Sequence, residues 1–152
     1  ALLGQIWDKA AGRFAFEQIG GCQAALEMGK AYTLGRYAFG RQVASFQAIK
    51  HKFADMFVAT ELARSNAYYG AWALNAGSEE LPLAAATARV SASDAFYLVS
   101  KENIQAHGGM GFTWEFDCHL YYRRAQLLAS VIGSQPHWRD ALVTRLLAQQ
   151  AA

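Results

Sequence analysis

The sequence has 152 residues, of which 53% are hydrophobic and 17% are charged. This length suits one domain with a single core but not a two-domain enzyme, and the composition is too apolar for a disordered chain. The 14 Lys and Arg are spread among 12 Asp and Glu, so no basic stripe for nucleic acid forms. No uncharged apolar run reaches the roughly 18 residues of a membrane span. We therefore expect a soluble protein without nucleic-acid or membrane partners.

The two cysteines, Cys22 and Cys118, lie far apart in the sequence. Neither a disulfide framework nor a CxxC metal or redox motif is indicated, which is typical of a reducing cytoplasm. The chain starts at Ala1 without a Met or a signal peptide, so we expect a fragment or processed product of a longer protein.

Three long helices are predicted first in chain order. Residues 2–34 are apolar on nearly every face, which predicts a central helix. Residues 47–75 repeat apolar or small side chains at steps of three and four and end before Gly77, a residue that tolerates the left-handed cap. Pro82 opens a third helix, 82–107, and the glycines that follow end it.

Two shorter helices are predicted after the glycines. The first covers about residues 117–131, and Gly133 separates it from the last, in which Ser134 or Gln135 is the N-cap and Pro136 lies in the first turn. The expected fold is all-α, an antiparallel four-helix-type bundle with an extra short helix. One domain would span residues 1–152.

Two local runs could carry chemistry. Gln105 precedes a glycine-rich run, residues 108–111, whose exposed N–H groups could meet a phosphate; the alternative is a simple glycine helix stop. Arg36, in the run Arg-Tyr-Ala-Phe-Gly, could hold a phosphate, and the nearby aromatic rings of Phe39 and Phe46 could cover a flat heterocycle. Singly, an exposed arginine and a loop phenylalanine packed on the core are the more common roles.

Taken together, the runs resemble the carboxy-terminal domain of the acyl-CoA dehydrogenase family. The resemblance covers essentially the whole chain through several motifs in order: R-x-x-F-G, an aromatic-Gln pair, A-D-M, Q-x-x-G-G-x-G-[FY]-[TN]-x-E and an aromatic-R-x-A run. They match Arg36 to Gly40, Phe46 and Gln47, Ala54 to Met56, Gln105 to Glu115 and Tyr122 to Ala125. The resemblance implies that in the family an amino-terminal helical domain and a middle β-domain precede this bundle, and we expect neither of them within residues 1–152.

The resemblance implies that the bundle binds FAD. Arg36 would contact the pyrophosphate, with Phe39, Phe46 and Gln47 near the adenosine part. The family's dimers share FAD across an interface within tetramers, so a homo- or hetero-oligomer is expected.

The resemblance also implies that the helix end at Gln105, Gly108 and Gly109 approaches the same cofactor from a neighbouring subunit. Ser134 stands where the family usually has a Thr that touches FAD. The substrate would be an acyl-CoA thioester, and the electron acceptor an electron-transfer flavoprotein.

The family's reaction is α,β-dehydrogenation of the thioester, in which a glutamate removes the α-proton. Ile132 occupies the usual base position and Ala10 the alternative one, and neither side chain can accept a proton. The chain alone is therefore expected to be inactive.

Three explanations of the missing base are open. The preferred one is a partner subunit that supplies the base, as in heterotetrameric relatives that act on steroid side-chain CoA thioesters, which the run Gly111 to Glu115 resembles. A second is a relocated base at Glu17, although a buried Glu17 paired with Arg13 is the plainer expectation. The third is a homomeric flavoprotein with other chemistry or none. A helical scaffold that has lost flavin is the alternative function.

Other candidates are weaker. Glu115, Asp117 and His119 alternate, but they lie between a glycine turn and a helix start, so no metal site is expected. His107 could face the flavin or cap its helix. The aromatic residues of 68–72 are predicted to lie in the core or at an interface.

Overall fold

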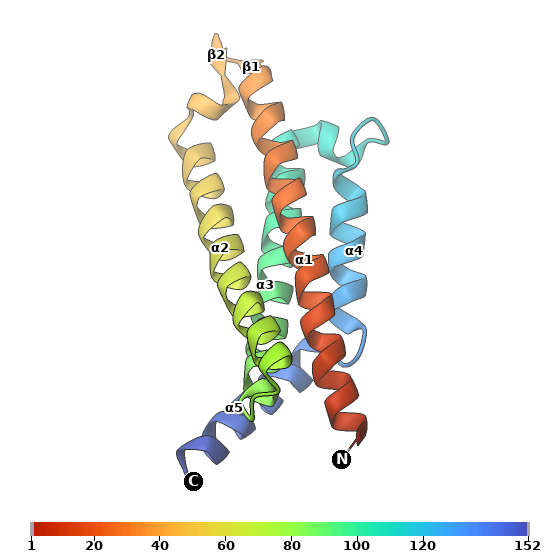
Figure 1. Cartoon of the computed structure of the whole chain (residues 1–152). Coiled ribbons are helices and arrows are strands. Elements are labelled where there is room, and N and C mark those ends of the chain that lie inside the picture. Colours follow the sequence, from red (N-terminus) through yellow and green to blue (C-terminus); the bar gives the residue numbers. More distant parts are fainter. Residues whose placement is uncertain (1, 152) are drawn as a thin grey trace.

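The computed structural model describes residues 2–151 and is almost entirely helical. Four helices run antiparallel along the molecule, and the fifth lies across the end opposite a small β-hairpin (Figure 1). The elements are α1 (Leu2–Gly35), β1 (Tyr37–Ala38), β2 (Arg41–Gln42), a 3-10 turn (Val43–Ser45), α2 (Gln47–Ala76), α3 (Leu81–His107), a second 3-10 turn (Gly108–Phe112), α4 (Cys118–Ser130) and α5 (Gln135–Gln150). The predicted all-α bundle is confirmed. No helix within residues 2–151 is long and apolar enough to cross a membrane.

The central helix is α3, because it packs against each of the other four helices. The prediction that α1 is central is wrong: Leu2, Leu3 and Phe16 of α1 are exposed. The buried part of α3 is rich in alanine, whose small side chain lets neighbouring helices approach on several faces. Alanine contributes little to an apolar stripe, so this role was hidden in the sequence.

Two buried clusters form the core. The larger joins α1, α2, α3 and α4 around Phe96 and Met56, and the smaller joins the start of α1 and α3 to α5 around Trp138. Cys22 and Cys118 are both fully buried free thiols. Burial raises the pKa of Cys22 to about 12 and also raises that of Cys118.

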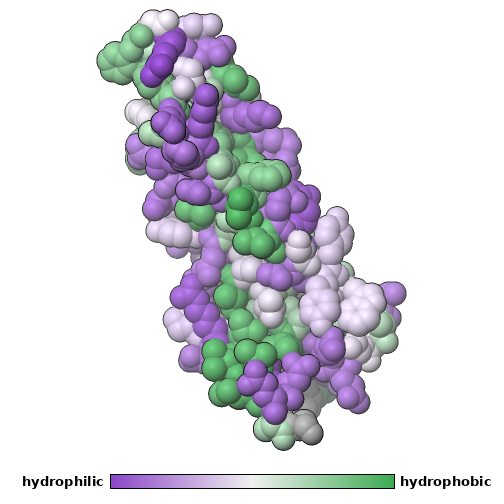
Figure 2. Space-filling model, turned by 90° about the vertical axis from the view of Figure 1, so that its left-hand side faces the viewer, coloured by the Kyte–Doolittle hydropathy of each residue, from purple (hydrophilic) through white to green (hydrophobic). Residues whose placement is uncertain are grey.

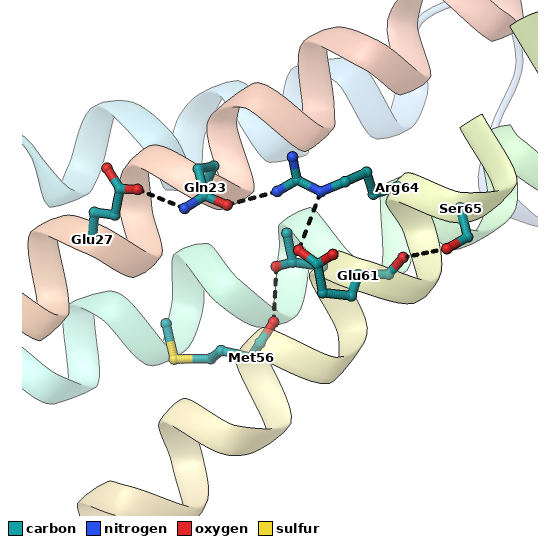
Figure 3. Close-up of polar contacts among 7 residues, drawn as sticks. Gln23, Glu27, Met56, Glu61, Arg64 and Ser65 are labelled. Carbon is teal, nitrogen blue, oxygen red and sulfur yellow. Dashed lines mark hydrogen bonds and ion pairs between the residues drawn. The ribbon is translucent and has the colours of Figure 1, made fainter. Parts of the chain in front are cut away.

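Polar contacts also tie the helices together. On the surface, Arg64 of α2 donates to the side-chain oxygen of Gln23 on α1 at 2.6 Å and to Glu61 at 3.1 Å (Figure 3). At the far end, Arg145 of α5 lies 2.9 Å from the carboxylate of Asp8 on α1. Burial raises the pKa of Asp8, and the charge of Arg145 partly offsets that rise.

The helix ends follow the predicted stops. Gly77 ends α2 with a left-handed φ of 63°, and Ser134 precedes α5 with a proline in its first turn. The hairpin was not predicted. Phe39 and Gly40 form its two-residue turn with φ values of 55° and 78°, as a type I′ turn requires.

Candidate functional site

The structure brings predicted residues from two distant segments to one cleft beside the hairpin. The cleft has a volume of about 470 Å³, and its lining includes Arg36 from the end of α1 and Gln105, Gly108 and Gly109 from the end of α3. Both segments belong to the same chain, whereas the resemblance implies that the Gln105 end approaches the cofactor bound by a neighbouring subunit. Tyr32 also lines this cleft and was not singled out in the sequence.

The electrostatics of the cleft favour an anion. Among residues 2–151 no carboxylate lies within ion-pair distance of the Arg36 guanidinium, and no acidic residue lines the cleft. The backbone of Arg36 is fixed, because its N–H donates to the Tyr32 carbonyl at 2.9 Å and its carbonyl accepts from Val43 at 2.8 Å. An exposed guanidinium without a carboxylate partner, on a backbone held in this way, is suited to a phosphate group.

The glycines of the cleft differ in role. Gly108 has φ 58° and ψ −137°, a conformation that a residue with a side chain rarely adopts. A Cβ on Gly108 or Gly109 would meet nothing within 4 Å, so their outer face is open to a ligand. A Cβ on Gly111 would lie 2.6 Å from the Ile104 carbonyl oxygen, so that glycine is required by packing.

The predicted adenosine-side residues lie at the same end of the bundle. Phe39 at the hairpin tip is 96% exposed and meets Phe46 edge-to-face at 6.3 Å between ring centroids. The Arg41 guanidinium lies 3.9 Å from the centroid of the Phe46 ring. Gln47 is exposed as the first residue of α2.

His107 is buried rather than presented to solvent. It stacks on Tyr32 at 4.2 Å, and its Nδ1 lies 2.8 Å from the Asn103 carbonyl, which can only accept, so Nδ1 carries the proton. Burial lowers the pKa of His107, which therefore remains neutral at neutral pH. Within the described part of the chain, its buried Nε2 has no hydrogen-bond partner.

Ser134 is not part of this cleft. It lies in the α4–α5 connection, at the opposite end of the bundle from the hairpin (Figure 1). Ile132 of the same connection packs against the cluster that contains Ala11, the neighbour of Ala10. The two positions at which the family's base was sought are therefore both at this end.

The environment of Glu17 differs from the one predicted. It is exposed and pairs with Arg124 of α4, whose Nε donates to its carboxylate at 2.7 Å, so the expectation of a buried pair with Arg13 is wrong. The reason is that Glu17 faces α4, where the arginine reaches across. Glu17 and Arg124 line a second cleft of about 610 Å³, whose lining also includes Gly21 and Phe96.

The remaining candidates do not assemble into a site. Within residues 2–151 no three His, Cys, Asp or Glu side chains converge as metal ligands would. Tyr68, Tyr69 and Trp72 are exposed rather than buried in the core. Two buried residues that donate to the α4–α5 connection, Arg89 of α3 and Trp138 of α5, were missed because nothing in their local sequence marks a buried polar role.

The five helices define an all-α domain of the bundle class. The model of the acyl-CoA dehydrogenase C-terminal domain matches residues 8–147, and the chain belongs to this family, whose members are FAD flavoproteins. Acyl-CoA dehydrogenase IpdE2 of Mycobacterium tuberculosis is 42% identical over 129 residues, which are 85% of this chain and 39% of the relative. Acyl-CoA dehydrogenase FadE34 of the same organism is 37% identical over 135 residues, which are 88% of this chain and 19% of the relative.

Solved structures share the fold. Butyryl-CoA dehydrogenase from Megasphaera elsdenii superposes with a TM-score of 0.91 at 28% identity, over 95% of this chain and 37% of that one. A variant of the Tcur3481–Tcur3483 steroid ACAD superposes with a TM-score of 0.94 at 25% identity, over 99% of this chain and 41% of that one. The chain thus spans well under half the length of these relatives.

Proposed function

We propose that this chain is the FAD-binding carboxy-terminal domain of an acyl-CoA dehydrogenase in which another polypeptide supplies the catalytic base. The observation that carries the proposal is the meeting of Arg36, Gln105, Gly108 and Gly109 at one cleft of one chain. An unpaired guanidinium and an open glycine corner fit the pyrophosphate of a dinucleotide. The exposed Phe39 ring at the hairpin tip, which lies at the same end of the bundle but outside the lining of the cleft, fits a flat heterocycle such as adenine.

The two ends of the bundle would serve different parts of FAD. Helix α1 has 34 residues, which corresponds to a length of about 50 Å, and the cleft lies at one end of the bundle while Ser134 lies at the other. One chain would therefore hold the pyrophosphate of one FAD through Arg36 and approach a second FAD through Ser134. This arrangement favours an assembly in which cofactors are shared between chains.

The proposed division of labour between chains follows from the lack of a carboxylate at the family's two base positions. Bound FAD supplies the hydride acceptor for α,β-dehydrogenation of an acyl-CoA thioester. Removal of the α-proton needs a carboxylate within hydrogen-bond reach, and neither Ile132 nor Ala10 offers one. Glu17 is engaged by Arg124 on the surface. A partner chain is the best source of the base, as the similarity to the Tcur3481–Tcur3483 steroid ACAD supports.

The electron acceptor we propose is an electron-transfer flavoprotein. A chain in a structure described as the electron transferring flavoprotein of Acidaminococcus fermentans is 30% identical to this one, with a TM-score of 0.92 over 95% of this chain. IpdE2 and FadE34 are acyl-CoA dehydrogenases, and the similar Tcur3481–Tcur3483 protein is described as a steroid ACAD, so the substrate class we propose is a steroid or fatty acyl-CoA.

The test uses the full-length protein, purified with and without a homologous partner subunit. We expect a yellow protein that dehydrogenates acyl-CoA only as the mixture. Arg36→Gln should lower FAD affinity at least about tenfold, because a charge-assisted contact contributes roughly 1.5–3 kcal/mol. Arg64→Gln is the matched control: it removes a guanidinium from the surface network of Figure 3 and should leave FAD affinity unchanged.

The outcomes separate the alternatives. A protein that stays colourless with added FAD would support a helical scaffold without flavin. A yellow protein that is active without any partner would overturn the shared-base proposal. Equal FAD affinities in the wild type and the Arg36 variant would remove the cleft from the cofactor site.

A further inference from the structure

The connection between α4 and α5 holds an unusual backbone. Ile132 has φ 54° and Gly133 has φ 103°. The left-handed conformation is unfavourable for any residue with a Cβ and most unfavourable for a β-branched one. Among the non-glycine residues of 2–151, only Phe39 shares a positive φ. Strain of this kind persists only where the surrounding structure imposes it.

Trp138, one turn into α5, is the first group that imposes this turn. Its ring is 2% exposed, and its Nε1–H donates to the Ile132 carbonyl oxygen at 2.9 Å. A Cβ on Gly133 would lie 3.3 Å from the same nitrogen and 2.8 Å from the ring of His137. The indole therefore both bonds the strained residue and fills the space over the glycine.

Arg89 of α3 is the second group. It is 1% exposed, and its guanidinium donates to the carbonyls of Leu128 and Val131, the latter at 2.9 Å, and to the Gln18 side-chain oxygen at 3.1 Å. Across residues 2–151 it has no carboxylate partner, and burial lowers its pKa to about 10. A buried cation is unfavourable unless its hydrogen bonds are satisfied, and here they fix the last carbonyls of α4.

The hydroxyl of Ser134, the residue after the turn, makes no capping hydrogen bond to α5. Ser134 occupies the N-cap position of α5, where a hydroxyl usually accepts from the helix backbone, but its side chain makes no such bond. Its side chain is exposed. The two buried groups thus hold a turn whose next hydroxyl remains available to a ligand.

We propose that Trp138 and Arg89 are positioning residues that hold the Ile132–Gly133 turn so that the Ser134 hydroxyl meets the flavin in one fixed orientation. This inference rests on the proposed function, because it assigns Ser134 to the FAD site. Without the indole hydrogen bond, Ile132 returns to a negative φ and Ser134 turns away.

The test is Trp138→Phe in the full-length protein with its partner, which keeps an aromatic ring and removes the donor. We expect hydrogen exchange of a peptide over residues 129–135 to rise at least tenfold, and the visible absorption bands of bound FAD to shift. Trp114→Phe makes the same chemical change at an exposed position in the connection before α4 and should alter neither. The double variant Trp138→Phe with Ile132→Gly should regain the wild-type flavin spectrum, because glycine adopts this φ without strain.

Three results would overturn the inference. Unchanged exchange in Trp138→Phe would show that the indole does not hold the turn. Faster exchange with an unchanged flavin spectrum would show that the turn does not orient the cofactor. A shifted spectrum that Ile132→Gly fails to restore would exclude strain at residue 132 as the cause. A colourless wild type is a different failure, that of the proposed function, and exchange still measures whether the indole holds the turn.

Discussion

Two residues that could carry charge, His107 and Arg89, are buried by segments that lie far from them in the sequence. The sequence marked Arg36 and the glycines after Gln105 as separate local runs, but that they line one cleft of one chain depends on how α1 and α3 pack. The burial of His107 could not be predicted, because it depends on Tyr32 of α1 stacking on it from a segment 75 residues earlier. Arg89 was missed for the same reason, since its acceptors belong to α1 and to the end of α4.

His107 should make stability depend on pH. Burial lowers its pKa from the ordinary 6.5, so the unfolded chain takes up a proton before the folded one does. The free energy of unfolding is therefore expected to fall as the pH drops below about 6.5. His107→Phe, which keeps a ring against Tyr32, should flatten this fall between pH 7 and 5 in urea denaturation.

The control for this prediction is His51→Asn, because His51 is exposed at the start of α2. Its pH profile should match that of the wild type. A His107→Phe profile as steep as the wild type would mean that other groups produce the acid sensitivity.

At the scale of elements, the long helices and their stops could be predicted because periodicity, glycine and proline are local signals. The hairpin could not, since each of its strands has two residues, too few for any alternation. Which helix is central could not be predicted either. Helix α3 is central because its alanines let the other helices pack closely against it, whereas a reading of the sequence by large apolar side chains assigns the central position to α1.

A substitution at the hairpin tip should change FAD affinity without lowering the free energy of unfolding. Phe39 holds a left-handed φ while almost fully exposed, so its ring adds little packing to offset the strain. Phe39→Asn should leave the free energy of unfolding unchanged or raise it by up to about 1 kcal/mol, because asparagine tolerates this turn position. The same change should weaken FAD binding in fluorescence titration of the full-length protein. A loss of stability with unaltered FAD affinity would assign Phe39 to folding instead.

At the scale of the whole molecule, one side of the bundle exposes apolar side chains. Figure 2 views the molecule from the α2 side and shows hydrophobic side chains gathered along it. What we call the α2 aromatic face consists of four exposed rings, Phe16 of α1 and Tyr68, Tyr69 and Trp72 of α2. Phe16 meets Tyr68 edge-to-face at 5.6 Å, and Tyr69 stacks on Trp72 at 5.7 Å. Exposed clusters of this kind favour association.

We expect the α2 aromatic face to contribute to the assembly that the proposed function requires. Trp72→Glu should place a charge in that contact and shift the full-length protein to a smaller species in light scattering. Leu147→Glu, an equally exposed position on α5, serves as the control and should not change the mass. An unaltered mass in the Trp72 variant would place the contact elsewhere.

The rate at which the two buried thiols are chemically labelled reports how often the bundle opens. Cys22 on α1 and Cys118 at the start of α4 are shielded from solvent, and their raised pKa values leave almost no thiolate at neutral pH. Alkylating reagents can therefore react only when the helices part. The pace of labelling at each sulfur then records how often α1 and α4 open, and whether both do so together.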